Sequence, residues 1–218
     1  MTTPVSVQLV AVVGGSGAGK GWLVARLSEL LGDRVCHLQL DDFYRDRSHL
    51  PLAARAELNY DEPAAIDWDA AERVLRDCRA GRPAQVPVYD FATYTRSGGR
   101  ETPPWQPRQI VLVDGLWLLH TPHIRALFDL KIYLDTPADI RCTRRLTRDI
   151  GERGYSLDLV EHQLRTAVLP MHDRYVEPQR KWADVVLTHP LDPTQISTLA
   201  ARIADFASAL PDAAALAS

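Results

Sequence analysis

The sequence has few cysteines, no long apolar run and no strong excess of charge. Its three cysteines, Cys36, Cys78 and Cys142, lie far apart and form no C-x-x-C pair, so neither a disulfide framework nor a zinc site is expected. No apolar segment approaches the length of about 18 residues that a membrane span needs. A formal net charge of −3 gives no support to a broad nucleic-acid-binding surface. These absences predict reduced thiols and no membrane or nucleic-acid partner.

The start of the chain and its histidines carry little signal. Residues 1–5 lack the basic start and the cleavage site of a signal peptide, which predicts a cytoplasmic protein. With 218 residues, 46% of them hydrophobic, the chain is long enough to form a single domain over 1–218. No zinc site is expected from the histidines, because none is paired convincingly with a cysteine or a carboxylate at the spacing of metal ligands. They are His37, His49, His120, His123, His162, His172 and His189.

The most informative stretch is glycine-rich and joins an apolar run to a helical pattern. It fits the phosphate-loop pattern G-x-x-x-x-G-K-[ST] up to Lys20, but Gly21 stands where the pattern has a hydroxyl that ligates Mg²⁺. Glycines let backbone N–H groups wrap a triphosphate, and the lysine reaches its outer phosphates. An ordinary glycine turn is the alternative interpretation. The residues expected to bind the nucleotide are Gly14, Gly15, Ser16, Gly17, Ala18, Gly19, Lys20 and Gly21.

Strand and helix patterns alternate along the chain, which predicts a doubly wound α/β fold with a parallel sheet. Strands are expected at 8–13, 35–40, 110–113, 130–134 and 185–187, and a small β-hairpin insertion at about 84–98. Helices are expected at 20–31, 52–58, 68–80, 122–128, from 137 onward, at 157–175 with a bend or break near Pro170, and at 194–210. The first of these helices is expected to bury Leu23, Leu27, Leu30 and Leu31.

Acidic residues follow two of the predicted strands. Asp41 and Asp42 end the strand at 35–40, and Asp114 ends the strand at 110–113. Open α/β sheets bind ligands at the carboxyl edge of their strands, so these side chains are expected beside the glycine-rich loop. The set suits phosphoryl transfer: Lys20 holds the phosphates, Asp114 holds Mg²⁺, and Asp41 takes a proton from an alcohol. A solvated loop or a helix cap is the alternative role for the Asp41–Asp42 pair.

A row of arginines predicts a lid that closes over phosphates, at about 141–156. The spacing i, i+3, i+4, i+7 puts Arg141, Arg144, Arg145 and Arg148 on one helix face, and Arg153 extends the positive region. Such a row, with few acids between its members, would repel itself without an anion. The alternative is a solvated stripe.

Two other segments indicate an acceptor that is larger than water. Carboxylates such as Asp61, in the run 59–61, suit the vicinal hydroxyls of a sugar, and flat rings suit a base. The rings come from the predicted hairpin, at Tyr89, Phe91 and Tyr94. Ordinary packing between the two strands of the hairpin is the alternative role for these rings.

Several ordered blocks resemble the uridine kinase (uridine-cytidine kinase) family, from about Val7 to Leu187. They are D-D-F-Y-R at 41–45, N-Y-D-E-P at 59–63, P-V-Y-D-F at 87–91 with Y-T-R at 94–96, D-I-G-E-R-G at 149–154 and A-D-V-V at 183–186. The resemblance implies a phosphate-loop kinase core with a hairpin over the nucleoside and a mobile lid. It also implies transfer from ATP or GTP, with Mg²⁺, to the 5′-hydroxyl of uridine or cytidine, and a homotetramer.

The resemblance carries roles over to residues that match its blocks. It implies that Asp41 is the base toward the 5′-hydroxyl, that Asp114 is the acid associated with Mg²⁺, and that Asp61 binds ribose hydroxyls. The remaining matches are pocket residues (Tyr44, Tyr89, Phe91), the base-reading hairpin position (Tyr94), lid arginines near the phosphates (Arg145, Arg148) and contacts on the nucleoside side (Arg153, Gln163).

The sequence departs from the family pattern at three positions. Gly21 replaces a Thr or Ser, Tyr94 stands where many members have His, and Tyr155 stands where many have Arg. Because Mg²⁺ keeps several waters, a water is expected to replace the hydroxyl missing at Gly21. The rival interpretations are a related kinase for another small alcohol, such as a sugar phosphate or a pantothenate-like compound, and a nucleotide-binding protein whose catalysis is impaired by Gly21.

Overall fold

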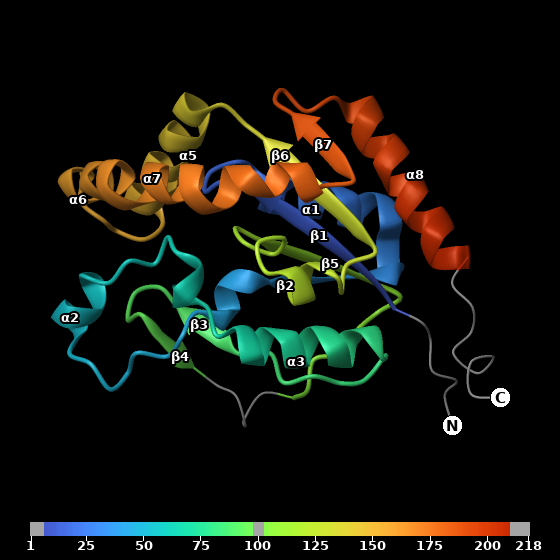
Figure 1. Ribbon diagram of the computed structural model, residues 1–218, viewed down its shortest axis with the longest axis horizontal. Coiled ribbons are helices and arrows are strands. Elements are labelled where there is room, and N and C mark those ends of the chain that lie inside the picture. Colours follow the sequence, from blue (N-terminus) through green and yellow to red (C-terminus); the bar gives the residue numbers. More distant parts are fainter. Residues whose placement is uncertain (1–6, 98–102, 210–218) are drawn as a thin grey trace.

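A five-stranded parallel sheet forms the centre of the computed structural model, which describes residues 7–97 and 103–209 (Figure 1). The strand order is β2-β5-β1-β6-β7, with bounds Val35–Gln39, Ile110–Gly115, Gln8–Gly14, Leu130–Asp135 and Val185–Thr188. All seven residues of β1 are buried, as expected for a central strand with both faces covered. The predicted doubly wound α/β fold is confirmed.

Helices cover the sheet on both faces, and the side chains of β1 alternate between two cores. Val10 and Val12 pack with α1 (Lys20–Leu31) and α8 (Pro193–Ala209), whereas Leu9, Ala11 and Val13 pack on the side of α3 (Trp68–Arg79). This alternation follows from the two-residue period of a strand. The helix predicted at 194–210 is therefore the partner of α1, and the last predicted residue, 210, lies outside the described residues.

The prediction for the buried face of α1 is wrong at one residue. Leu23, Leu27 and Leu31 are buried, but Leu30 is 42% exposed and Val24 is buried instead. On a helix of 3.6 residues per turn, Leu30 lies at the margin of the stripe that these residues define, and Val24 lies inside it.

The remaining elements are short, apart from α5 (Ala138–Gly151) and the long helix described next. The short ones are a 3₁₀ turn at Leu40–Phe43, α2 (Leu52–Ala56), the hairpin strands β3 (Val88–Asp90) and β4 (Thr95–Ser97), and α4 (Pro122–Arg125). The strand predicted at 35–40 thus ends one residue early, at Gln39. The helix predicted at 122–128 also ends early, at Arg125.

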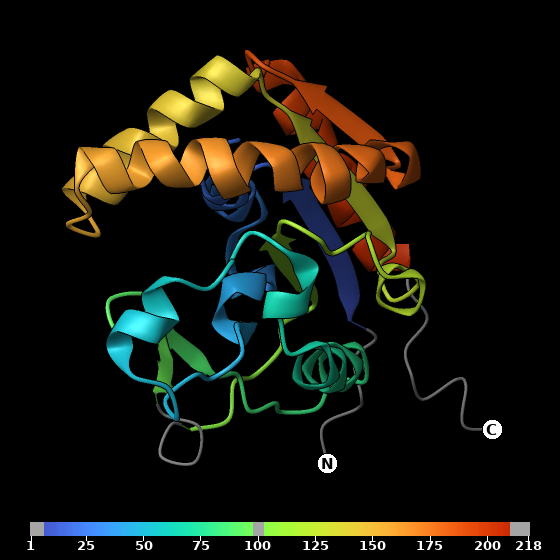
Figure 2. The ribbon, with the colours of Figure 1, turned by 60° about the vertical axis from the view of Figure 1, so that its left-hand side comes forward.

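Of the bend or break predicted near Pro170, the structure shows no break: the helix continues past the proline with π-helical turns on both sides. It runs from α6 (Leu157–Gln163) through α7 (Leu169–Met171), with π-helical stretches at Leu164–Val168 and His172–Val176, and ends as a 3₁₀ segment at Trp182. In the π-helical turn before the proline, the Leu169 N–H donates to the Leu164 carbonyl, five residues back instead of four. Figures 1 and 2 show the resulting rod crossing the molecule from the lid to the sheet. Among the helices described, none is long and apolar enough to cross a membrane.

Arg96 anchors the hairpin to the segment that carries Asp41. Its guanidinium donates to the carbonyls of Phe43 and Tyr44, at 2.8 and 2.7 Å, and to Asp67 at 3.1 Å. Asp67 also caps α3 by accepting the Ala70 N–H at 3.1 Å. Burial raises the pKa of Asp67, but the bonds from Ala70 and Arg96 outweigh it, so the net pKa is lowered.

We predict that Asp67→Ala lowers the free energy of unfolding by about 1 to 2 kcal/mol, because it removes a helix cap. A carboxyl with a lowered folded-state pKa stabilises fully above its unfolded value and loses that effect as the pH falls through the folded value. The difference from wild type should therefore shrink in strong acid. Urea denaturation at several pH values measures it, with the exposed Asp69→Ala as the control. Equal effects at Asp67 and Asp69 would refute the cap.

Candidate active site

The glycine-rich loop folds around the side chain of Lys20. After β1 the chain turns through Gly17 and Gly19, which have φ values of 76° and 98°, and enters α1. The Lys20 ammonium donates to the carbonyls of Gly14 and Gly15, both at 3.1 Å. Burial lowers the pKa of Lys20, and the carboxylates of Asp114 and Asp41 oppose that shift. The loop therefore holds a cation at the point where β1 ends.

Two acidic side chains lie near enough to Lys20 for their charges to affect its pKa. Asp41 is in the 3₁₀ turn after β2, and Asp114 is on β5 in register with Gln39 of β2. Burial and the neighbouring charge of Asp114 raise the pKa of Asp41, against the opposing effect of Lys20. The sheet edge thus brings together a lysine and the two carboxylates that the sequence placed there.

These groups suit Mg²⁺ without enclosing it. Asp41 and Asp114 offer carboxylate oxygens, the donors that Mg²⁺ prefers, and this ion usually binds through one or two carboxylates together with phosphates and water. The described residues contain no cluster of three or more metal-ligating side chains. A Cβ built on Gly21 meets nothing within 4 Å, so there is open space where a hydroxyl would stand.

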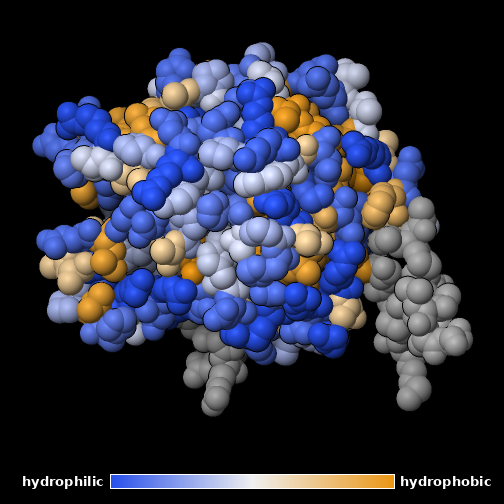
Figure 3. Space-filling model, in the orientation of Figure 1, coloured by the Kyte–Doolittle hydropathy of each residue, from blue (hydrophilic) through white to orange (hydrophobic). Residues whose placement is uncertain are grey.

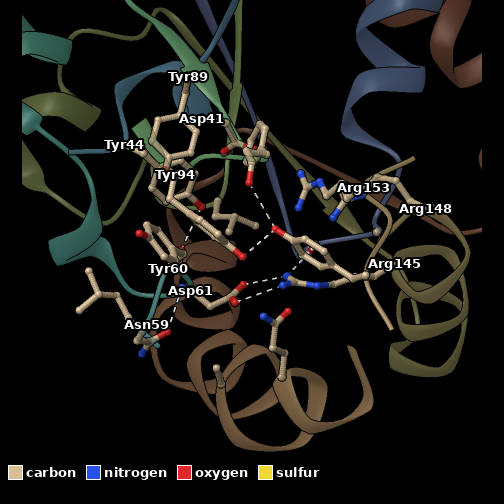
Figure 4. A pocket seen from close by; sticks show the side chains of 18 of the residues that line it. Asp41, Tyr44, Asn59, Tyr60, Asp61, Tyr89, Tyr94, Arg145, Arg148 and Arg153 are labelled. Atoms are coloured by element: carbon tan, nitrogen blue, oxygen red, sulfur yellow. Dashed lines mark hydrogen bonds and ion pairs between the residues drawn. The ribbon is translucent and has the colours of Figure 1, made fainter. Parts of the chain in front are cut away.

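The predicted acceptor residues surround one pocket that also reaches the glycine-rich loop (Figure 4). Figure 3 shows the surface indented between the upper and lower lobes on this side of the molecule. Besides Ser16, Gly17 and Lys20 of the loop, the pocket is lined by Asp41, Tyr44, Asp61, Tyr89, Phe91, Tyr94, Arg145, Arg148, Arg153 and Gln163. Asp114 is not among its lining residues. Its charge acts on Lys20 and Asp41, which do line the pocket.

Aromatic rings form one wall of this pocket. Tyr44 is buried, with ring centroids 5.1 Å from Tyr89 and 6.2 Å from Phe91. Tyr94 has a φ of 54° in the hairpin turn, which is uncommon for a residue with a side chain, and its ring stacks on Tyr60 at 5.2 Å. The hairpin therefore presents the faces and edges of aromatic rings to a ligand in the pocket.

Arginines of the lid form the opposite wall, and Figure 4 shows Arg145 reaching across to Asp61. Arg145 donates to both oxygens of Asp61, at 2.9 and 3.3 Å, and to the Ser16 hydroxyl at 3.1 Å. Burial alone would lower the pKa of Arg145, but the carboxylates of Asp61 and Asp149 raise it. This residue therefore joins the glycine-rich loop, the lid and the acceptor side.

Asp149 is a central residue of the lid to which sequence reasoning gave no role. Its side chain is fully buried and forms ion pairs with Arg145, Arg148 and Arg153, at 3.1, 2.9 and 3.4 Å. Arg153 also lies 4.1 Å above the ring of Phe91. No acid lies between the four arginines of the predicted row, but Asp149 and Asp61, which lie outside it, offset the charges of the later arginines. Its position four residues after Arg145 was the available signal.

Two arginines of the predicted row do not share this arrangement. Arg141 is buried behind the glycine-rich loop, and its Nε donates to the Thr136 carbonyl at 3.0 Å. A Cβ on Gly17 would collide with the Arg141 carbonyl oxygen, so the helix backbone packs directly on the loop. Arg144 approaches the Ala18 carbonyl at 3.4 Å. Only the later part of the row reaches the pocket.

Two further contacts of the site were not predicted from the sequence. The hydroxyl of Tyr155 donates to that of Tyr94 at 3.0 Å, so two positions that depart from the family pattern touch each other. His37 contacts Asp114 through Nε2 and Oδ1 at 2.9 Å. The partners are 61 and 77 residues apart, and no local pattern connects them.

Comparison with known proteins gives close relatives and more distant structural neighbours. Residues 9–194 match the family model described as the phosphoribulokinase / uridine kinase family. A uridine kinase of Staphylococcus epidermidis is 41% identical over 180 residues, which cover 82% of this chain and 86% of the relative. A uridine kinase of Staphylococcus aureus is 41% identical over 183 residues, which cover 84% and 87%.

The structural neighbours are under 25% identical, so their similarity supports the fold alone. Phosphoribulokinase from Rhodobacter spheroides superposes with a TM-score of 0.61 and 18% identity, covering 84% of this chain and 70% of that one. D-glycerate 3-kinase from Cryptococcus neoformans gives a TM-score of 0.62 and 17% identity, covering 88% of each chain. With its match to the family model and its 41% identical relatives, the chain belongs to the phosphoribulokinase / uridine kinase family and is a kinase, an enzyme that takes a phosphoryl group from a nucleotide.

Proposed function

We propose that the protein phosphorylates the 5′-hydroxyl of uridine, cytidine or both, using ATP or GTP, in pyrimidine salvage. One observation carries the proposal: loop residues Ser16, Gly17 and Lys20 open onto the same pocket as Asp61 and the ring of Tyr94. A phosphate donor in the loop and a nucleoside among the rings would therefore meet. The 41% identity to relatives named uridine kinase supports the same substrates.

The rest of the proposal follows the family resemblance. We propose one domain over 1–218, with the hairpin at about 84–98 and the lid at about 141–156. We also propose a cytoplasmic homo-oligomer, a tetramer as in related kinases, that acts on a small nucleoside and takes no membrane or nucleic-acid partner. Mg²⁺ near Asp114 would offset charge on the β- and γ-phosphates.

In the proposed reaction, Asp41 takes the proton of the 5′-hydroxyl as its oxygen bonds to the γ-phosphorus. The bond from that phosphorus to the bridging oxygen breaks, and the nucleoside diphosphate leaves. The raised pKa of Asp41, which burial and Asp114 cause, suits a group that must accept a proton. Lys20 and the loop N–H groups hold the phosphates, and Arg145 and Arg148 stabilise the charge that moves.

Asp61 is suited to the ribose, because its carboxylate keeps acceptor capacity after binding Arg145. A carboxylate accepts about four hydrogen bonds, and Arg145 supplies two. Gln163 and Arg153 line the same pocket and would contact the nucleoside. At the base end, Tyr89, Phe91 and the hydroxyls of Tyr94 and Tyr155 offer stacking and hydrogen bonds that suit either pyrimidine.

We predict turnover with at least one of uridine and cytidine in an assay coupled to ADP release. Asp41→Asn should lower kcat by about 10² to 10⁴-fold, because the proton acceptor is lost. Nucleotide affinity should stay nearly unchanged, because Lys20 and the glycine-rich loop, which hold the phosphates, remain intact. Asp42→Asn is the matched control. Its amide oxygen can still accept the Tyr89 N–H, which Asp42 binds at 3.3 Å.

The same assay, together with a measurement of ATP binding, separates the rival functions. Binding of ATP without turnover of any ribonucleoside would indicate a nucleotide-binding protein that has lost catalysis. Turnover of a different small alcohol would indicate a related kinase. Full activity of Asp41→Asn would show that Asp41 is not the base.

We predict that the wild-type enzyme is active and that Gly21→Thr lowers the Mg²⁺ concentration needed for half-maximal rate. The open space around Gly21 admits the side chain, and its hydroxyl could replace a water on the ion. Gly21→Ala is the matched control. It adds about 0.5 to 1 kcal/mol of helix stability without a hydroxyl and should leave the Mg²⁺ dependence unchanged. An inactive wild type that Gly21→Thr rescues would instead mean natural impairment.

A further inference from the structure

His37 and Asp114 meet on one face of the sheet, at its carboxyl edge. In the parallel register of β2 and β5, His37 lies opposite Leu112, and Asp114 is two residues further along β5 on the same face. The imidazole Nε2 lies 2.9 Å from Asp114 Oδ1. Among the described residues, His37 is the one hydrogen-bond partner of the Asp114 side chain.

Packing alone does not account for a histidine at this position. Leu112, opposite His37 on β5, is aliphatic, and so is Val35, two residues before His37 on the same face of β2. The imidazole is 28% exposed and the Asp114 side chain is 15% exposed. A half-buried site among aliphatic neighbours would accept a valine or an isoleucine, so the ring nitrogen is the property that distinguishes His37.

We infer that His37 is a positioning residue that fixes the Asp114 carboxylate toward the metal on the donor phosphates. The inference rests on the proposed function. An N–H at Nε2 donates to Oδ1, which leaves Oδ2 for the metal or for a water bound to it. The terminal torsion of an aspartate is broad, so an unheld carboxylate would sample other orientations.

The absence of a hydroxyl at Gly21 increases the need for this orientation. A phosphate loop with Ser or Thr holds Mg²⁺ from two sides, through that hydroxyl and through the acid at the end of the neighbouring strand. Here Gly21 offers no ligand, so more of the positioning falls on Asp114. Groups that orient a metal ligand commonly change metal affinity by about 10 to 100-fold when they are lost.

Metal binding tests the inference without any acceptor substrate. Mn²⁺ replaces Mg²⁺, a non-hydrolysable ATP analogue replaces the donor, and electron paramagnetic resonance measures free Mn²⁺. His37→Ala should weaken Mn²⁺ binding to the protein–nucleotide complex at least about tenfold. His37→Gln, whose amide nitrogen can occupy the Nε2 position, should restore affinity to near the wild-type value. The shorter His37→Asn should not, and the exposed His123→Ala should match wild type.

Two results would overturn the inference. One is a wild-type Mn²⁺ affinity in His37→Ala, and the other is an equal Mn²⁺ affinity of the Gln and Asn variants. The Gln and Asn comparison decides the matter even if His37→Ala fails to fold, and thermal denaturation identifies that case. A wild-type protein that binds neither the analogue nor Mn²⁺ would contradict the proposed function itself, and the inference with it. In kinetic assays, the Mg²⁺ concentration for half-maximal rate should rise in His37→Ala while the KM for the nucleoside stays unchanged.

Discussion

The lid depends on the ion pairs that the buried carboxylate of Asp149 forms with three arginines. Arg145, Arg148 and Arg153 would repel one another if brought together alone, and a fully buried anion between them removes that repulsion. Breaking a buried ion pair by removing one partner typically costs about 3 to 5 kcal/mol. With Asp61 added, the cluster retains one positive charge in excess, so an anion is still attracted to it.

The same cluster connects the two halves of the site. Arg145 reaches the segment at 59–61 through Asp61, and Arg153 reaches the hairpin through the ring of Phe91. Tyr155, at the start of the segment that leads into α6, reaches Tyr94. A small apolar cluster of Val160, Leu164 and Val168, with Tyr155 packed on it, supports the lid from behind. The arginines of this cluster are therefore coupled physically to the segment at 59–61 and to the hairpin.

Local pattern predicted what depends on local structure. The path from β1 through the loop to α1 follows from an apolar run, glycines and a helical period, and the carboxyl edge then places Asp41 and Asp114. The order of strands does not follow from such patterns, because β5 inserts between β2 and β1 through contacts between distant segments. The His37 contact with Asp114 depends on that order and on the register, which is why no spacing in the sequence indicated it.

The helix around Pro170 and the position of Arg141 also depend on structure that local sequence patterns do not predict. A proline signals a break, but π-helical turns on both sides absorb it, and this compensation has no signature in single residues. Periodicity placed Arg141 with the other arginines of its face. The neighbour that decides its burial is the glycine-rich loop, more than a hundred residues earlier in the chain.

The contact between Gly17 and the Arg141 backbone has a mechanical consequence. The first turn of α5 rests on the glycine-rich loop, and α5 is one continuous helix from Ala138 to Gly151. The close contact at Gly17 therefore also sets where the later turns of the same helix place Arg145, Arg148 and Asp149. A side chain at position 17 would push the whole helix outward and carry these three residues away from the pocket.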